Sequence, residues 1–417
     1  MRAFTMLIIA VVLIGGCQAE SETEERVQAT YTWHTDIKPL IDNYCIRCHT
    51  EGSIGVGDFR DQETVFALAD LMLARIKEGS MPPPVADPTC QDYVASEHLS
   101  VAAEDKAIFA TWVAEGKPEG TPGVSDSTTI APEPELEDYD LELQISAPFT
   151  PTFSNESRLG NEYRCFILDP NVDETIYLTA MHPIIDKTKI SHHAVIAKVP
   201  RGVPFNAGPD GFDCFDLSFS ETFKDVVIGT WAPGTLPLIF DEGMGMKVRP
   251  NEVFLIQMHY FMSGPESLDQ PTLPGYRFRI AESVEREVEL ITVGDYDFEI
   301  PAGASDHRHT ATLRADRDYK VLGAFPHMHV LGSGYELKVD DSDTCIVRAD
   351  RYDFDNQLMY QLNTPVDLKQ GETLSFTCRW DNSEDNPDQI NETVQDVVAG
   401  EYTNQEMCFA FALVVKD

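Results

Sequence analysis

The sequence has little positive charge and few long apolar segments. It contains 31 Lys and Arg residues against 70 Asp and Glu residues, which gives a formal net charge of -39. Such an acidic surface repels phosphates and argues against binding of nucleic acid. After the N-terminus no stretch is apolar enough for a transmembrane helix, and no repeat of fixed period is visible. The acidity predicts a solvated surface, and an acidic face that docks a basic redox partner is the alternative.

The N-terminus has the features of an export signal. An apolar run over residues 7–14 has signal-peptide length and is too short to span a bilayer. It ends in Ile14-Gly15-Gly16-Cys17, which resembles the lipobox of bacterial lipoproteins. We therefore expect a leader over residues 1–17 with lipidation of Cys17, and a plain cleavage site just after it is the alternative. Gln18 indicates, by the usual sorting rule, the periplasmic side of the outer membrane.

Length and composition predict several domains. A chain of 417 residues that is 42% hydrophobic is expected to form about two to four of them. Residues 31–120 have short helical patterns, and the acidic Pro/Ser/Thr-rich residues 121–140 form a linker, with a surface loop as the alternative. Beyond them, short runs of β-branched and aromatic residues predict two all-β, jelly-roll-like sandwiches. Two prolines and a glycine over 270–275 place their division between 141–272 and 273–417.

One motif predicts covalent haem. Cys45-Ile46-Arg47-Cys48-His49 has the C-x-x-C-H pattern, in which both thiols form thioethers to the haem and the histidine binds the iron. A redox dithiol or half a zinc site shares the cysteine spacing. With its three short helices, the region 31–120 resembles a small class I cytochrome c.

Met81 is the expected sixth ligand of this haem. It lies in a proline-rich loop after the predicted middle helix, where class I cytochromes c place a methionine ligand. Packing of Met81 against the ring edge is the alternative, and His34 and His98, expected at the surface, are rival ligands. A six-coordinate haem leaves no position for dioxygen, so the resemblance implies an all-α domain for electron transfer.

Three histidine clusters and one methionine in the β-rich region predict metal sites. The H-x-H pair has a spacing that, on a strand, places both imidazoles on one side, where they can chelate one ion. The four segments, in chain order, are Ser191-His192-His193, Gln257-Met258-His259, Pro326-His327-Met328-His329 and Glu406-Met407-Cys408.

The order of these segments resembles that of the type II copper, ascorbate-dependent monooxygenases, the family of peptidylglycine α-hydroxylating and dopamine β-monooxygenases. The resemblance covers about residues 141–415. It implies two copper ions, a small-molecule substrate and dioxygen. The ligands that it implies are His192, His193 and His259 for the electron-transfer copper, and His327, His329 and Met407 for the catalytic copper that reacts with dioxygen.

The ligand types agree with copper chemistry. Imidazole holds both copper oxidation states, and a thioether favours Cu(I), the form that meets dioxygen. Gln257 matches a family position that orients His259 or the water between the sites. Relatives take their electrons from ascorbate. Because a haem domain precedes the copper domains here, we expect haem c to pass electrons to the first copper and an external donor to reduce the haem again.

Three other histidines do not match the ligand segments of the family. His307-Arg308-His309 has H-x-H spacing, but we interpret it as a surface strand with a metal site as the alternative. His182 has no assigned role.

The nine cysteines fall into three groups. One belongs to the lipobox and two to the haem motif, and the even remainder predicts three disulfides in an oxidising compartment. The family resemblance implies a Cys378–Cys408 pair beside the methionine ligand. Within the first β-domain Cys165–Cys214 is the expected pair. A Cys90–Cys345 bridge between the haem and copper domains is a hypothesis.

Substrate-binding positions depart from the peptide-hydroxylating relative. Phe325, Phe409 and Phe411 stand where that enzyme holds a substrate carboxylate with Arg, Asn and Tyr. Apolar rings cannot pair with a carboxylate, which favours a neutral or apolar substrate, unless these are ordinary strand residues. The sequence therefore predicts a copper monooxygenase. A copper-binding or storage lipoprotein and a module that only transfers electrons are the alternatives.

Overall fold

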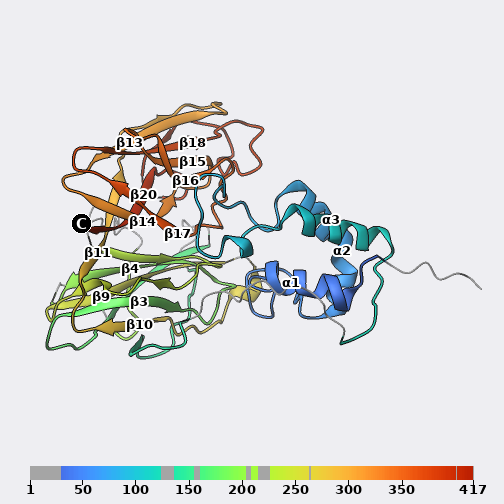
Figure 1. The fold of residues 1–417 in the computed structure, drawn as a ribbon, viewed down its shortest axis with the longest axis horizontal. Coiled ribbons are helices and arrows are strands. Elements are labelled where there is room, and N and C mark those ends of the chain that lie inside the picture. Colours follow the sequence, from blue (N-terminus) through green and yellow to red (C-terminus); the bar gives the residue numbers. More distant parts are fainter. Residues whose placement is uncertain are drawn as a thin grey trace, which may run out of the picture.

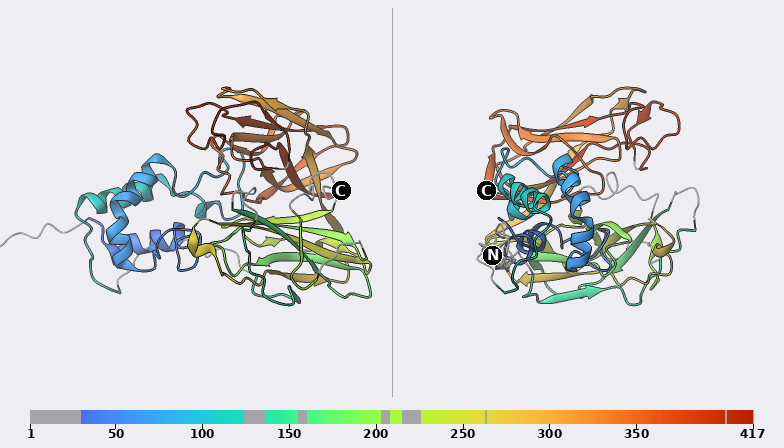
Figure 2. Two further views of the ribbon diagram at one scale, coloured as in Figure 1. Left: turned by 180° about the vertical axis from the view of Figure 1, so that it is seen from behind. Right: turned by 90° about the vertical axis from the view of Figure 1, so that its right-hand side faces the viewer.

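The computed structural model describes residues 30–123, 136–154, 160–202, 208–214, 226–262, 264–400 and 402–416. They form one helical unit at one end of two stacked β-sandwiches, as Figure 1 shows and Figure 2 repeats from two other sides. The predicted lipidation site Cys17 lies outside the described residues, as does most of the predicted linker. None of the described helices is both long enough and apolar enough to cross a membrane.

The N-terminal unit packs short helices around an aromatic core. Helix α2 begins after Asp61, whose carboxylate accepts a hydrogen bond from the N–H of Thr64, and ends at Gly79 with φ of +75°. The rings of Trp33, Phe66 and Trp112 lie with centroids 5.2–6.4 Å apart. The helices are η1 (Trp33–Ile37), α1 (Lys38–Tyr44), α2 (Gln62–Glu78), η2 (Ser96–His98) and α3 (Ala103–Ala114).

The first sandwich packs a five-stranded sheet, in the order β5-β2-β9-β4-β6, against β1-β10-β3-β8, with β7 beside β3. One buried cluster with side chains from both sheets forms its core. The strands are β1 (Leu141–Gln144), β2 (Asn161–Leu168), β3 (Ile176–Ile184), β4 (Ser191–Pro200), β5 (Phe212–Asp213), β6 (Val227–Trp231), β7 (Leu238–Ile239), β8 (Met244–Val248), β9 (Glu252–Phe261) and β10 (Gly275–Ala281), and a short helix η4 (Pro265–Ser267) precedes β10.

The second sandwich packs β11-β20-β14-β17 against β13-β18-β15-β16. A short parallel pairing of β11 with β8 joins its first sheet to the sheet of the first sandwich. The strands are β11 (Arg286–Gly294), β12 (Glu299–Ile300), β13 (His307–Arg314), β14 (Tyr319–His327), β15 (Gly332–Val339), β16 (Thr344–Ala349), β17 (Tyr360–Leu368), β18 (Thr373–Trp380), β19 (Val397–Val398) and β20 (Phe409–Lys416).

Strand β10 tests the predicted boundary between the two sandwiches at 272/273. Its residues follow that division, yet they pair with β1 and β3 of the first sandwich. The structure therefore places 275–281 in the first sandwich, and the chain passes to the second between β10 and β11. Pro271, Pro274 and Gly275 mark the turn into β10 instead of a domain boundary.

Strand β20 shows how the sequence aims side chains at two different surfaces. It lies between β11 and β14, and seven of its eight residues are buried. Ala410 and Ala412 enter the core of the second sandwich, whereas Phe409 and Phe411 form a separate buried cluster on the opposite face. This alternation is the ordinary two-residue period of a strand. It directs the phenylalanines toward the first sandwich.

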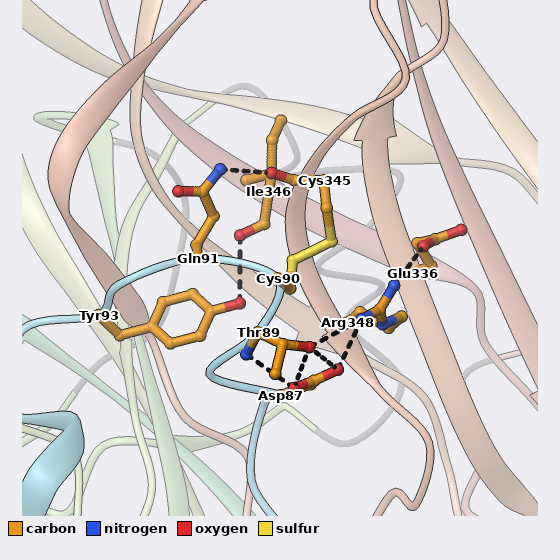
Figure 3. The surroundings of a disulfide bond; sticks show 9 residues. All are labelled: Asp87, Thr89, Cys90, Gln91, Tyr93, Glu336, Cys345, Ile346 and Arg348. Carbon is orange, nitrogen blue, oxygen red and sulfur yellow. Dashed lines mark hydrogen bonds and ion pairs between the residues drawn. A yellow bond between two sulfur atoms is a disulfide. The ribbon is translucent and has the colours of Figure 1, made fainter.

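Residues 85–94, here called the strap, leave the helical unit between α2 and α3 and lie on the second sandwich. Ala86 and Tyr93 belong to the buried core of that sandwich, and Tyr93 forms an isolated bridge with Leu362. A disulfide joins Cys90 to Cys345 of β16, 255 residues later in the chain (Figure 3). The helical unit is thus attached to the second sandwich, although the first follows it directly in sequence.

Candidate functional site

His192, His193 and His259, here called the first trio, meet on neighbouring strands. Their candidate ligand atoms all lie within 4.8 Å of one another, which suits one ion because metal–imidazole bonds are about 2 Å long. His193 of β4 stands opposite His259 of β9, and the register shifts between Ser191 and His193. Consecutive strand residues normally face opposite sides, and this irregularity allows His192 to join its neighbour.

In the first trio, hydrogen bonds occupy one ring nitrogen of His192 and one of His259, here called the outer histidines. Nε2 of His192 lies 2.7 Å from a carboxylate oxygen of Asp355, and Nε2 of His259 lies 2.7 Å from Oδ1 of Asn161. The Nδ1 atoms of these two histidines are buried and have no hydrogen-bond partner among the described residues. Buried polar atoms of this kind require a ligand, so Nδ1 is the atom suited to hold a metal.

The environment keeps two histidines of the first trio neutral. Burial, followed by the neighbouring imidazoles, holds the pKa of His193 and of His259 well below the usual histidine value. The Asp355 carboxylate has a lowered pKa because it is hydrogen-bonded to His192. Neutral imidazole is the form that binds a metal, and a nearby carboxylate strengthens its donor nitrogen.

His327, His329 and Met407, here called the second trio, come from the ends of adjacent strands. His327 is the last residue of β14 and stands opposite Phe409 of β20, with Met407 two residues before that phenylalanine. The two imidazoles lie with ring centroids 5.2 Å apart at nearly a right angle. Together with Met407 they line one cavity.

The opposite nitrogen is selected in the second trio. Nδ1 of His327 lies 2.6 Å from Oε1 of Gln357, and Nδ1 of His329 lies 3.1 Å from the carbonyl oxygen of Gln405. Nε2 is therefore the nitrogen that would bind a metal in both. Burial, with His327 as a further cause, lowers the pKa of His329 to about 3.

Glu406 holds the segments of the second trio together. Its fully buried carboxylate accepts hydrogen bonds from the main-chain N–H groups of His329 and Leu331 and from the indole of Trp380, at 2.7–2.9 Å. Burial raises the pKa of Glu406 to about 7, while these donors oppose the rise. One side chain thus joins the H-x-H turn to the residue beside Met407.

His193 of the first trio faces the same cavity as the whole second trio, and this cavity has a volume of about 90 Å³. His192 and His259 line a separate cavity on the other side of the first trio. Half of the other residues that line the 90 Å³ cavity are aromatic, and Thr230, Gln257 and Gln357 supply polar groups. Gln257 approaches the sulfur of Cys214 at 3.9 Å through its amide nitrogen. The aromatic wall consists of Tyr163, Trp231, Phe325, Phe354, Phe409 and Phe411.

The C-x-x-C-H motif forms the turn after α1. Among the described cysteines, Cys45 and Cys48 are the two outside a disulfide, and burial raises the pKa of Cys45 to about 12. Nδ1 of His49 lies 2.9 Å from the carbonyl oxygen of Val56, and its ring stacks on Phe59 with centroids 4.1 Å apart. This hydrogen bond directs Nε2 outward as a ligand atom, so the residues present fit a covalent haem.

The candidates for the sixth ligand lie in different surroundings. Met81 follows α2 in an exposed loop, with 43% of its surface accessible. His34 is partly buried, and its Nε2 lies 3.6 Å from a carboxylate oxygen of the exposed Glu119. The prediction that His98 lies at the surface is wrong, because only 6% of this residue is exposed. Its neighbour Leu99 enters the core of the second sandwich.

The remaining histidines lie away from both trios. His309 of β13 lies 2.8 Å from a carboxylate oxygen of Asp295, and His307 lies beside the ring of Trp380. His182 of β3 stands opposite Arg277, and burial lowers its pKa to about 4. These residues lie on strands whose ordinary contacts account for them.

All three predicted disulfides are present. Cys165–Cys214 lies in the first sandwich, and Cys378–Cys408 fixes the residue after Met407. Cys90–Cys345 joins the helical unit to the second sandwich, as hypothesised from the leftover pair.

Sequence reasoning missed four residues that orient the histidines. They are Asp355 beside His192, Asn161 beside His259, Gln357 beside His327, and Glu406 beside the main chain of His329. Only Glu406 carried a local signal, as an acidic residue directly before the predicted methionine ligand.

Comparisons with known proteins support copper chemistry for the second sandwich. Residues 289–414 match the family model of the copper type II ascorbate-dependent monooxygenase C-terminal domain. The match supports this family, and with it a copper-dependent monooxygenase and an oxidoreductase. No curated protein matches the chain.

Solved structures add no argument about function. The infectious bursal disease virus VP2 subviral particle aligns at 11% identity and a TM-score of 0.16, over 68% of this chain and 81% of that one. A Paenibacillus xanthan lyase aligns at 12% identity and a TM-score of 0.16, over 72% of this chain and 28% of that one.

Proposed function

We propose that this protein is a copper-dependent monooxygenase that hydroxylates a small, neutral or apolar organic substrate, with electrons relayed by its own haem c. The observation that carries the proposal is that one cavity is lined by the whole second trio and by His193, a member of the first trio. Each trio has the composition expected for copper, and the match of residues 289–414 to the copper monooxygenase family supports the second.

The chain supplies the ligands and their orientation. When bound, two copper ions supply one-electron redox chemistry and the activation of dioxygen. His192, His193 and His259 would hold one, and His327, His329 and Met407 the other. Asp355, Asn161, Gln357 and the Gln405 carbonyl fix the ring orientations. The balanced reaction takes substrate, dioxygen, two electrons and two protons to the alcohol and one water.

The cavity wall supports an apolar substrate. Phe325, Phe409 and Phe411 form a buried cluster with Met407 itself. In register, Phe325 stands opposite Phe411 and His327 opposite Phe409, so the rings extend directly from the second trio. They exclude water and provide no partner for a carboxylate, which disfavours peptide C-termini as substrates.

The helical unit would serve as a cytochrome c domain. Cys45 and Cys48 would attach the haem, His49 would bind its iron, and Met81 would be the sixth ligand. An external periplasmic redox protein or small reductant would reload it. Lipidation at Cys17 would anchor the protein on the periplasmic side of a bacterial membrane, in our proposal the outer membrane.

The decisive test compares intact protein with His329→Ala and Met407→Ala variants, after metal and haem analysis. We expect one iron and two copper ions per chain in the intact protein. Both variants should lose the hydroxylated product and keep an unchanged haem spectrum. Product formation that survives both changes would contradict the oxygenase proposal and favour a copper-storage or electron-transfer protein.

A further inference from the structure

Residues 351–357, here called the connector, lie between β16 and β17 of the second sandwich. They contact both the helical unit and the two histidine trios. Their contacts suggest a role beyond joining two strands.

The connector holds both sides of the loop that carries Met81. Arg351 donates a hydrogen bond of 3.0 Å to the carbonyl oxygen of Gly79, at the end of α2. The amide of Asn356 donates a hydrogen bond of 2.9 Å to the carbonyl oxygen of Pro84. The Met81 loop therefore has a fixed position relative to the second sandwich.

The same segment reaches the histidines. The carboxylate of Asp355 lies 2.7 Å from Nε2 of His192 in the first trio. The ring of Phe354 lies between the trios, with centroids 5.0 Å from His192 and 6.1 Å from His329. A path from Pro84 to His192 thus contains two hydrogen bonds, joined by the covalent chain from Asn356 to Asp355.

The strap keeps this arrangement rigid. The Cys90–Cys345 disulfide and an ion pair of 2.6 Å between Asp87 and Arg348 fix it to β16, the strand directly before the connector (Figure 3). A haem unit bound in this way would not need to swing on a tether to deliver an electron.

We propose that the connector is the electron path from the haem unit to the first copper, and that Asp355 and Asn356 are its positioning residues. This inference rests on the proposed function. One electron passes: haem iron is oxidised from Fe(II) to Fe(III), copper is reduced from Cu(II) to Cu(I), and an external one-electron donor restores the haem. No bond forms or breaks.

A cavity of about 610 Å³ beside the connector offers the competing route. Ser80, Pro84, His192, His259 and Asp355 are among its lining residues. A small reductant such as ascorbate that entered there would reach the first trio directly. The experiment must therefore separate internal transfer from direct reduction.

The test uses full-length protein loaded with haem and copper and kept free of dioxygen. Flash photoreduction delivers electrons to the haem, and its visible absorption then follows reoxidation by copper. In intact protein the rate should be independent of protein concentration, because the transfer is intramolecular. Asp355→Ala and Asn356→Ala should each slow reoxidation about tenfold, the lower end of the effect of losing a ligand-orienting partner.

The controls separate the path from general damage. Asp388→Ala removes another carboxylate from the same cavity wall and should leave the rate unchanged. Asp355→Asn keeps an oxygen acceptor for His192 and should restore most of the rate. Copper content, the copper EPR spectrum and the haem spectrum should be those of the intact protein in Asn356→Ala, which touches no histidine of the trios.

Two results would overturn the inference. One is reoxidation at the intact rate in Asn356→Ala with both coppers retained. The other is the absence of haem-to-copper transfer in intact protein that hydroxylates substrate with ascorbate. In that second case copper oxygenation stands and only the relay fails, whereas the oxygenase proposal fails if copper-loaded protein makes no product with any donor.

Discussion

The two trios use the same residue type in opposite ways. The first offers three imidazoles from the neighbouring strands β4 and β9, with Nδ1 of its outer histidines left for a metal. The second offers two imidazoles and a thioether from strand ends, with Nδ1 occupied by hydrogen bonds. Three imidazoles accept both copper oxidation states, whereas the thioether favours the reduced ion. The ligand sets therefore suit storage of an electron at one site and reaction with dioxygen at the other.

The largest expected effect comes from variants that each remove one ligand from one trio. His259→Ala should remove one of two coppers in both oxidation states and lower product formation by at least about 100-fold, the upper range for losing an orienting partner alone. Met407→Ala should retain copper in oxidised protein and lose it on reduction. Metal analysis of oxidised and reduced samples checks the contrast. Equal losses in both variants would show that the sites do not differ as their ligands imply.

A smaller effect tests the orienting partners. Asn161→Ala should lower the copper affinity of the first trio about tenfold, because Asn161 fixes the ring of His259. Gln357→Ala should do the same at the second trio, because Gln357 fixes the ring of His327. Competition with a copper chelator measures both affinities. If either change lowered the copper affinity of both trios equally, the two sites would be coupled through the cavity and would not be independent.

The hydrogen bonds that Glu406 accepts hold together the second trio and have no counterpart described in the first. Above pH 7, where its carboxylate is ionised, Glu406 only accepts hydrogen bonds. Glu406→Gln introduces an amide whose NH₂ faces buried N–H donors, which should lower the free energy of unfolding by about 2 kcal/mol at that pH. Denaturant unfolding of the apo protein measures it. Glu289→Gln is the control, since this half-buried partner of Lys416 should cost less than about 1 kcal/mol.

The smallest expected effect concerns pH. Hydrogen bonds from Arg348 and then Thr89 lower the pKa of Asp87 from 3.8 to about 2. A lowered pKa contributes stability above the unfolded value, and that contribution is lost as the pH falls from about 4 toward 2. Since both partners are partly exposed, we expect Asp87→Asn to cost less than about 1 kcal/mol at pH 7. The difference between the two proteins in urea unfolding should shrink as the pH falls through about 2 and disappear below it.

Local patterns predicted the elements well where periodicity was strong. Short helices lie within residues 31–120, and short strands follow from Leu141 onward, where β-branched and aromatic runs indicated them. Position 275 was misleading, because its glycine allows the close approach of β1 and does not mark a domain boundary.

The site divides in the same way. Histidines, methionine and cysteines carry their chemistry in their identity, so they could be found without a structure. Asp355 and Gln357 could not, because acidic and amide residues are common on surfaces and only their three-dimensional contacts with His192 and His327 distinguish them. The register shift at His192 also depends on which strand pairs with β4.

The Cys90–Cys345 disulfide has a consequence for biogenesis. Its second cysteine is synthesised 255 residues after the first, so the disulfide that attaches the helical unit cannot form until β16 has been synthesised and folded. During that interval Cys90 is a third thiol beside the two that a haem would need, and an oxidase acting early would pair it wrongly. If haem is attached as we propose, Cys45 and Cys48 would therefore have to react with it, or be shielded, before Cys90 meets its distant partner.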